Sequence, residues 1–248
     1  MIISIIKRGV RGFLESNGYY LQQRVALPYG LDYMLDIERL CRAWNFSVLT
    51  FFDVGANWGE TSARALTRFP GARIFAFEPS ASTFVRLRGH LGKEPRFSPH
   101  NIALGEACGE VAFFEYESSF YNSLVPNPPL QSGFNSTAQE TVVPCSTIDA
   151  FCEGHKIGHI DVLKVDAERC DLWVLRGARN MFAGDRIRFV YFEFNNAVPA
   201  PDVQESALVP ISEFLTPFGF RFVATYIDRI ETNPMFLIAN AMFVRPAA

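Results

Sequence analysis

The sequence has little that marks a secreted or nucleic-acid-binding protein. Its five cysteines form no Cys-x-x-Cys pair, and an odd number at irregular spacing in 248 residues argues for reduced thiols rather than a disulfide framework. Lys and Arg number 23 against 26 Asp and Glu, so the net charge is −3, and no run of basic residues concentrates the positive charge. Nucleic acid is therefore not an expected partner.

The chain also has no long apolar run near its start. The stretch at 1–13, MIISIIKRGVRGF, is interrupted by Ser4 and is followed, rather than preceded, by basic residues. It fails both as a secretory signal and as a membrane span. We expect this stretch to pack on the body of a cytoplasmic protein without stable membrane insertion. A short amphipathic helix on a membrane surface is the alternative.

What the chain does have is the composition of a globular protein, with 49% apolar residues, 24 Phe and only 20% charged residues. Nothing near its middle reads as a linker. We expect an N-terminal extension at 1–45, which packs on or caps the core, followed by one α/β domain at 46–248.

Short apolar runs alternate with helical segments from Val48 onward, which is typical of a parallel sheet covered by helices on both faces. The pattern predicts strands at 48–53, 73–77, 97–104, 160–165 and 187–193, and helices at 59–69, 81–92, 146–153 and 171–183. It also predicts an extra strand at 111–116, a long polar loop at 117–140 and a closing antiparallel hairpin within 219–244.

The most informative stretch is FFDVGANWGE, residues 51–60. A buried strand ends at Asp53, and Gly55 and Gly59 follow in a turn that leads into a helix. Such a turn holds nucleotides at the carboxyl edge of a parallel sheet. Glu78 closes the second strand at the spacing where an acid meets ribose hydroxyls. The pair predicts an adenosine-containing cofactor, with a merely structural turn as the alternative.

A dinucleotide fits this turn poorly. Asn57 and Glu60 stand where G-x-G-x-x-G requires glycine, and the acids Asp53 and Glu60 flank the place where a pyrophosphate needs positive potential. A cationic ligand fits better. S-adenosylmethionine carries a sulfonium and an ammonium, so Asp53 would attract its methionine end while the glycines let the backbone approach closely.

Several motifs then follow in one order. They are DVGANWGETS (53–62), FEPSASTFVRL (77–87), NIALGEACGEVAFF (101–114), YNSL (121–124), STIDAF (146–151) and LKVDAERCDLWVLRGA (163–178). With these motifs the chain resembles the FkbM family of class I S-adenosylmethionine-dependent methyltransferases, which mostly methylate hydroxyl oxygens of sugars, glycolipids or natural products. The resemblance implies a Rossmann-like fold, a mostly parallel sheet with a C-terminal antiparallel hairpin.

The resemblance also implies a cofactor site along the ends of the strands, with the methionine end at the glycine turn, the ribose at Glu78 and the adenine near Asn101. The residues it assigns to S-adenosylmethionine are Asp53, Gly55, Ala56, Asn57, Gly59, Glu78, Pro79, Asn101, Ala103 and Asp166. The family usually has K-I-D-x-E-G-x-E after its fourth strand. Here Arg169 replaces the glycine and Asp171 the last glutamate.

Methyl transfer to a neutral hydroxyl requires alignment of the acceptor and a base. We expect the base at Asp166, then Glu193, then Glu168, near the ends of the fourth and fifth strands. Lys164 lies two residues before Asp166 and faces the same side of the strand, so a structural ion pair is the alternative role for Asp166. Glu193 could instead hold a neighbouring backbone group or Asn195.

The expected acceptor is a hydroxylated small molecule, a sugar or a natural product. Its predicted binding residues are Tyr121, Asn122, Ser123 and Asn195. His155 and His159 have i, i+4 spacing but fall at the opposite edge of the sheet, so no metal is expected. An N-methyltransferase is second choice because DAER stands where N/D-P-P-Y would grip an amine. A Rossmann-like binding protein or dehydrogenase is the rival from another class, and a homodimer is compatible with all readings.

Overall fold

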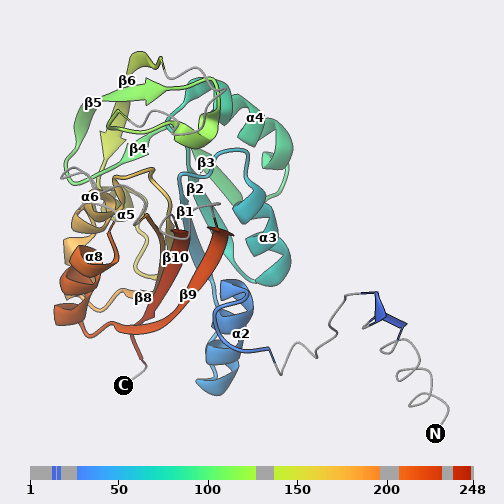
Figure 1. The fold of residues 1–248 in the computed structure, drawn as a ribbon. Coiled ribbons are helices and arrows are strands. Elements are labelled where there is room, and N and C mark those ends of the chain that lie inside the picture. The colour runs from blue at the N-terminus through green and yellow to red at the C-terminus, as the bar shows by residue number, and fades with distance from the viewer. Residues whose placement is uncertain are drawn as a thin grey trace, which may run out of the picture.

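The computed structural model describes residues 13–14, 16–17, 27–126, 137–195, 207–230 and 237–246. Its centre is a seven-stranded sheet in the order β3-β2-β1-β7-β8-β10-β9 (Figure 1). The strands from β3 to β8 in this order pair in parallel, and β10 is antiparallel to both β8 and β9. This arrangement confirms the predicted Rossmann-like class I methyltransferase fold with its closing antiparallel hairpin.

The strands of the central sheet are β1 (Thr50–Val54), β2 (Arg73–Phe77), β3 (Phe97–His100), β7 (Ile160–Val165), β8 (Ile187–Asn195), β9 (Arg221–Ile230) and β10 (Leu237–Val244). A second sheet, of three strands, holds β4 (Ala103–Leu104), β6 (Gln139–Ser146) and β5 (Gly109–Glu115). The helices are α2 (Tyr33–Ala43), α3 (Glu60–Arg68), α4 (Ala81–Leu91), α5 (Ile148–Gly154), α6 (Asp171–Arg176), α7 (Arg179–Ala183) and α8 (Leu208–Leu215).

Helices cover both faces of the central sheet, which is why strands such as β7 read as continuous apolar runs. Side chains of α2, α3 and α4 pack on one face, and those of α5, α6, α7 and α8 pack on the other. All six residues of β7 are buried. The three-stranded sheet lies above the carboxyl ends of the central strands (Figure 1).

Helix α2 shows how part of the N-terminal extension joins the core. Asp32 caps the helix by accepting hydrogen bonds from the backbone N–H groups of Met34 and Leu35. Met34 and Ile37 are fully buried against the face that includes Phe51. Residues 1–12, which we expected to pack on the protein, lie outside the described part of the chain.

The predicted elements differ from the structure in several places. The predicted strand at 97–104 is two strands, β3 and β4, in different sheets, and the helix at 171–183 is two helices. The break between α6 and α7 falls at Gly177, which packs directly against the backbone carbonyl of Gly105. The sequence also missed strand β6, whose first residues were predicted as loop. Residues 127–136 of that loop and 231–236 of the hairpin lie outside the described residues.

None of the helices within the described ranges combines the length and apolar character needed to cross a bilayer.

Candidate active site

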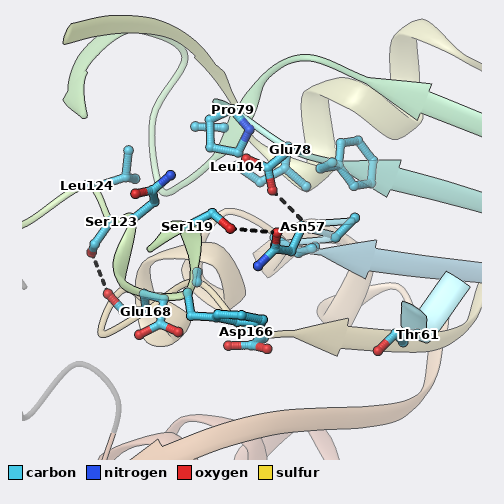
Figure 2. Close-up of a pocket in the computed structure, with 18 of the residues that line it drawn as sticks. Asn57, Thr61, Glu78, Pro79, Leu104, Ser119, Ser123, Leu124, Asp166 and Glu168 are labelled. Carbon is cyan, nitrogen blue, oxygen red and sulfur yellow. Dashed lines mark hydrogen bonds between the residues drawn. The ribbon is translucent and has the colours of Figure 1, made fainter. Parts of the chain in front are cut away.

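A cavity of about 220 Å³ opens at the carboxyl edge of the central sheet. Because β1, β2 and β7 run in parallel, their carboxyl ends meet at this edge, and the chain leaves each strand through a turn that faces the cavity. The turns after β1 and β7 form its floor. Residues of the three-stranded sheet and of the segment 118–126 cover it (Figure 2).

The glycine turn, residues 55–59, follows β1. Gly55, Asn57 and Gly59 all have positive φ, at 70°, 46° and 87°. A side chain on Gly55 would collide with the backbone carbonyl of Asp166, and one on Gly59 would lie 2.6 Å from Leu87. These glycines are therefore required by neighbouring protein atoms, and not only by a ligand as the sequence suggested.

Asp53 lies beneath the cavity rather than in its wall. Its side chain is fully buried, and one carboxylate oxygen accepts a hydrogen bond of 2.6 Å from the Ser62 hydroxyl. The other oxygen lies 3.1 Å from the ammonium nitrogen of Lys164. Asp53 thus contacts Lys164, which does line the cavity. Asp53 therefore does not itself line the cavity, and its expected role at the methionine end of the cofactor stays a prediction.

Glu78 stands in the cavity wall at the end of β2 and is 6% exposed. Its two carboxylate oxygens accept hydrogen bonds from the backbone N–H groups of Asn57 (Figure 2) and Ser80, each at 2.9 Å. Burial raises the pKa of Glu78 to about 7, although these two hydrogen bonds oppose the shift. Glu78 therefore holds the glycine turn in place and presents a carboxyl group with little water around it.

The side of the cavity beyond Glu78 is apolar. Pro79, Ile102, Ala103, Leu104 and Phe113 line it, which makes a slot suited to a flat ring. Asn101 does not line the cavity. Its side-chain amide instead donates to the backbone carbonyls of Glu78 and Pro79, at 2.8 and 2.9 Å, and so fixes this wall from behind.

Three carboxylates gather at the other end. Oxygen atoms of Asp166, Glu168 and Glu193 lie within 4.8 Å of one another, and all three side chains are partly exposed. Asp166 and Glu168 line the cavity. The set could supply three oxygen ligands to one hard cation. Lys164 already lies 3.4 Å from Asp166, and acidic groups this exposed also gather without an ion, so the absence of a metal stays a prediction.

The turn after β7 carries the clearest departure from the FkbM pattern. Glu168 and Arg169 both have positive φ, 45° and 77°, so the usual glycine position is one where glycine is favoured sterically. The guanidinium group of Arg169 donates to the backbone carbonyl of Pro126 at 2.9 Å. Arg169 thus connects this turn to the segment that covers the cavity.

We call this covering segment, residues 118–126, the roof segment. The Ser119 hydroxyl donates to the side-chain carbonyl of Asn57 at 3.0 Å, and the Ser123 hydroxyl makes a short hydrogen bond to the backbone carbonyl of Glu168 (Figure 2). Asn122 accepts a hydrogen bond from the backbone of Tyr116 at 2.8 Å. The roof segment is therefore pinned at both ends of the cavity by its own polar side chains.

The structure brings most of the predicted residues together. Gly55, Ala56, Asn57, Glu78, Pro79, Ala103, Asn122, Ser123, Asp166 and Glu168 line the cavity. Glu193 lies beside Asp166, whereas Gly59, Asn101 and Tyr121 do not line the cavity, and the Asn195 side chain is outside the described part. Sequence reasoning missed Thr61, Ser119 and Lys164 as wall residues. Thr61, in the first turn of a helix that follows a glycine loop, could have been found by its position.

The same residues carry the family assignment. The Methyltransferase FkbM domain model matches residues 53–222, which include both turns, the roof segment and the acidic cluster. The chain belongs to this family.

Two curated relatives match part of the chain. Hexuronic acid methyltransferase AglP of Haloferax volcanii is 30% identical over 155 residues, which cover 61% of this chain and 58% of AglP. 2-O-methyltransferase NoeI of Sinorhizobium fredii is 22% identical over 153 residues, which cover 58% of this chain and 62% of NoeI. The chain thus spans about three fifths of the length of the curated relatives it matches.

Solved structures agree less closely. The N-methyltransferase NodS of Bradyrhizobium japonicum, in complex with S-adenosyl-L-homocysteine, has a TM-score of 0.46 and 11% identity, covering 87% of this chain and 86% of NodS. The fold assignment therefore depends on the strand order and the family, and not on this likeness.

Proposed function

We propose that the protein is an S-adenosylmethionine-dependent O-methyltransferase that acts on a hydroxyl group of a sugar, a glycan or a natural-product small molecule. One observation carries the proposal. A single cavity holds Glu78, a buried acid at the position expected for ribose binding, with an apolar slot beside it. Asp166 and Glu168 lie at the far end of the same cavity.

The residues present fit this cofactor. The slot at Ile102, Leu104 and Phe113 suits an adenine ring, and the Glu78 carboxylate would accept hydrogen bonds from the ribose hydroxyls. Asn57, in the glycine turn, and Thr61, in the first turn of α3, line the cavity where the methionine end would lie. Bound there, S-adenosylmethionine supplies an activated methyl group on a positively charged sulfur.

The chain's own residues would orient the acceptor and remove its proton. Asp166 and Glu168 are the acids that line the cavity, with Glu193 next to them, so the acceptor hydroxyl would lie against this acidic cluster. A carboxylate of the cluster would take up the hydroxyl proton as the acceptor oxygen gains the methyl group and the carbon–sulfur bond of the donor breaks. Asp166, whose side chain is 33% exposed, is the first candidate for this base.

The Asp166→Asn variant tests that role. We expect it to bind S-adenosylhomocysteine as the natural chain does and to transfer methyl groups at least about 100-fold more slowly, since general bases contribute on the order of 10²–10⁴ in rate. Isotopically labelled methyl donor, supplied with a panel of sugars and hydroxylated metabolites, gives both the acceptor and the rate. Full activity in this variant would move the base to Glu168 or Glu193.

A thermal-shift comparison tests the cofactor class. At about 100 times its Kd, S-adenosylhomocysteine should stabilise the fold by about 2.7 kcal/mol, or roughly 5–10 °C for a domain of this size. NAD should have no effect, because Glu60 stands where its fingerprint needs glycine. Stabilisation by NAD alone would instead support the dehydrogenase reading.

The acceptor class rests on the relatives. One is described as a hexuronic acid methyltransferase and the other as a 2-O-methyltransferase. We therefore place sugars first in the acceptor panel. Amines belong in the same panel, because methylation of an amine and of no hydroxyl would favour the N-methyltransferase alternative.

A further inference from the structure

Lys164 occupies an unusual position in the cavity wall. It is 5% exposed, and its ammonium group contacts both turns of the floor. It donates to the backbone carbonyls of Val54 and Gly55, at 3.2 and 3.0 Å. The same nitrogen lies 3.1 Å from a carboxylate oxygen of Asp53 and 3.4 Å from one of Asp166. One cation thus holds the glycine turn and the candidate base together.

The surrounding charges show why this cation is stable there. Burial alone would lower the pKa of Lys164, but the carboxylates of Asp53 and Asp166 outweigh it and hold the pKa above its ordinary value. The side chain therefore stays charged across the working pH range. Removing one member of a buried pair leaves an uncompensated charge, whereas removing both members is tolerated far better.

The charge of Lys164 is also opposite in sign to the charges of the acidic side chains that line the cavity. Among the described residues that line it, the acids are Glu60, Glu78, Asp166 and Glu168, and the only Lys, Arg or His is Lys164. If the proposed function holds, the donor and its product differ by one charge on sulfur, since the sulfonium becomes a neutral thioether. A fixed cation in the wall disfavours the charged donor relative to the product.

We propose that Lys164 is a positioning residue that ties the glycine turn to Asp166 and sets the preference of the site between S-adenosylmethionine and S-adenosylhomocysteine. This inference rests on the proposed function. By offsetting the acids of the floor, Lys164 limits how strongly the donor is held. The preference for the donor then depends on the balance between Lys164 and its two carboxylate partners.

Four proteins test the proposal: the natural chain, Asp53→Asn, Lys164→Met and the double variant that carries both changes. Calorimetry gives Kd for S-adenosylmethionine and for S-adenosylhomocysteine with each protein. Lys164→Met should raise the donor preference, the ratio of the product's Kd to the donor's Kd, by about fivefold, because a nearby positive charge is lost. Asp53→Asn should lower this ratio by a similar factor. The double variant should return close to the natural value.

A loss of packing alone would weaken both ligands and leave their ratio unchanged, so the ratio separates the two roles. Lys93→Met, an exposed lysine outside the cavity, is the matched control and should leave the ratio unaltered. If Lys164→Met does not fold, Asp53→Asn and the double variant still differ only at Lys164. Equal ratios in that pair would overturn the inference. A natural chain that binds neither ligand would overturn the proposed function instead.

Discussion

Glu78 is the residue whose chemistry depends most directly on its burial. Its pKa of about 7 lies above the ordinary 4.5, so the folded protein binds an extra proton between these values. The contribution of Glu78 to the free energy of unfolding is therefore full below pH 4.5 and is lost as the pH rises through 7. Ribose hydroxyls that donate to the carboxylate would favour its ionised form.

From this we predict that binding of S-adenosylhomocysteine releases a proton near pH 6 and weakens by up to about tenfold per pH unit below 7. Calorimetry in two buffers with different heats of ionisation measures the proton. In Glu78→Gln both effects should disappear, because the amide does not titrate in this range. A variant that kept the natural pH dependence would show that another group is responsible.

Arg169 is a residue held in a conformation that its side chain disfavours. With φ at 77°, a glycine there avoids a steric cost of about 1 kcal/mol. Arg169→Gly and Arg169→Ala both lose the hydrogen bond to Pro126, so their difference isolates the backbone. We predict that the free energy of unfolding, measured by urea titration, is about 1 kcal/mol higher for the glycine variant than for the alanine variant. Equal stabilities would mean that the turn relaxes around alanine.

The sequence predicts a site residue well where the place of that residue in the fold depends only on its own strand or turn. Glu78 closes an apolar strand, and its place in the wall follows from the parallel sheet. The role of Asp53 did not follow, because it depends on whether a distant lysine reaches beneath the turn. A strand pattern shows which side Lys164 faces, but not that its ammonium group fills the space between two carboxylates.

At the scale of the element, β2 and β7 were predicted with their observed bounds, since both are short apolar runs between clear turn signals. Strand β6 was missed because it belongs to a small sheet. Only Val143 and Cys145 of its eight residues are buried, so the apolar signal is too weak to stand out beside the polar loop that precedes it. The pairing with β5, rather than local sequence, defines it.

Helix α2 is joined to the hairpin by a buried hydrogen bond. The Tyr226 hydroxyl of β9 donates to the Asp36 carboxylate at 2.9 Å, whereas the buried Tyr33 hydroxyl has no hydrogen-bond partner among the described residues. We predict that Tyr226→Phe lowers the free energy of unfolding by about 1.5–3 kcal/mol, since a hydrogen bond to a charged group is lost. Tyr33→Phe, the matched control, should change it by less than about 0.5 kcal/mol or raise it. Denaturant titrations of both variants decide whether the hydroxyl contact or the aromatic packing attaches α2.

At the scale of the whole molecule, the core continues past the predicted boundary at residue 46. Met34 and Ile37 are fully buried, and each such side chain contributes about 1.5–3 kcal/mol. We predict that a chain beginning at residue 46 is less stable by at least about 3 kcal/mol than one beginning at residue 27, which keeps α2 and its cap. Denaturant midpoints of the two truncated chains measure the difference. Similar midpoints would place the folding unit at 46–248, as the sequence suggested.

The close packing of Gly59 against α4 has a consequence for any survey of inactive variants. Leu87 and Leu91 lie where a side chain on Gly59 would be, so this helix supports the end of the glycine turn from outside the cavity. Enlarging either leucine would push on that support before it touched any ligand atom. Loss-of-function substitutions should therefore also appear on the inner face of α4, although α4 would be absent from a map of ligand contacts.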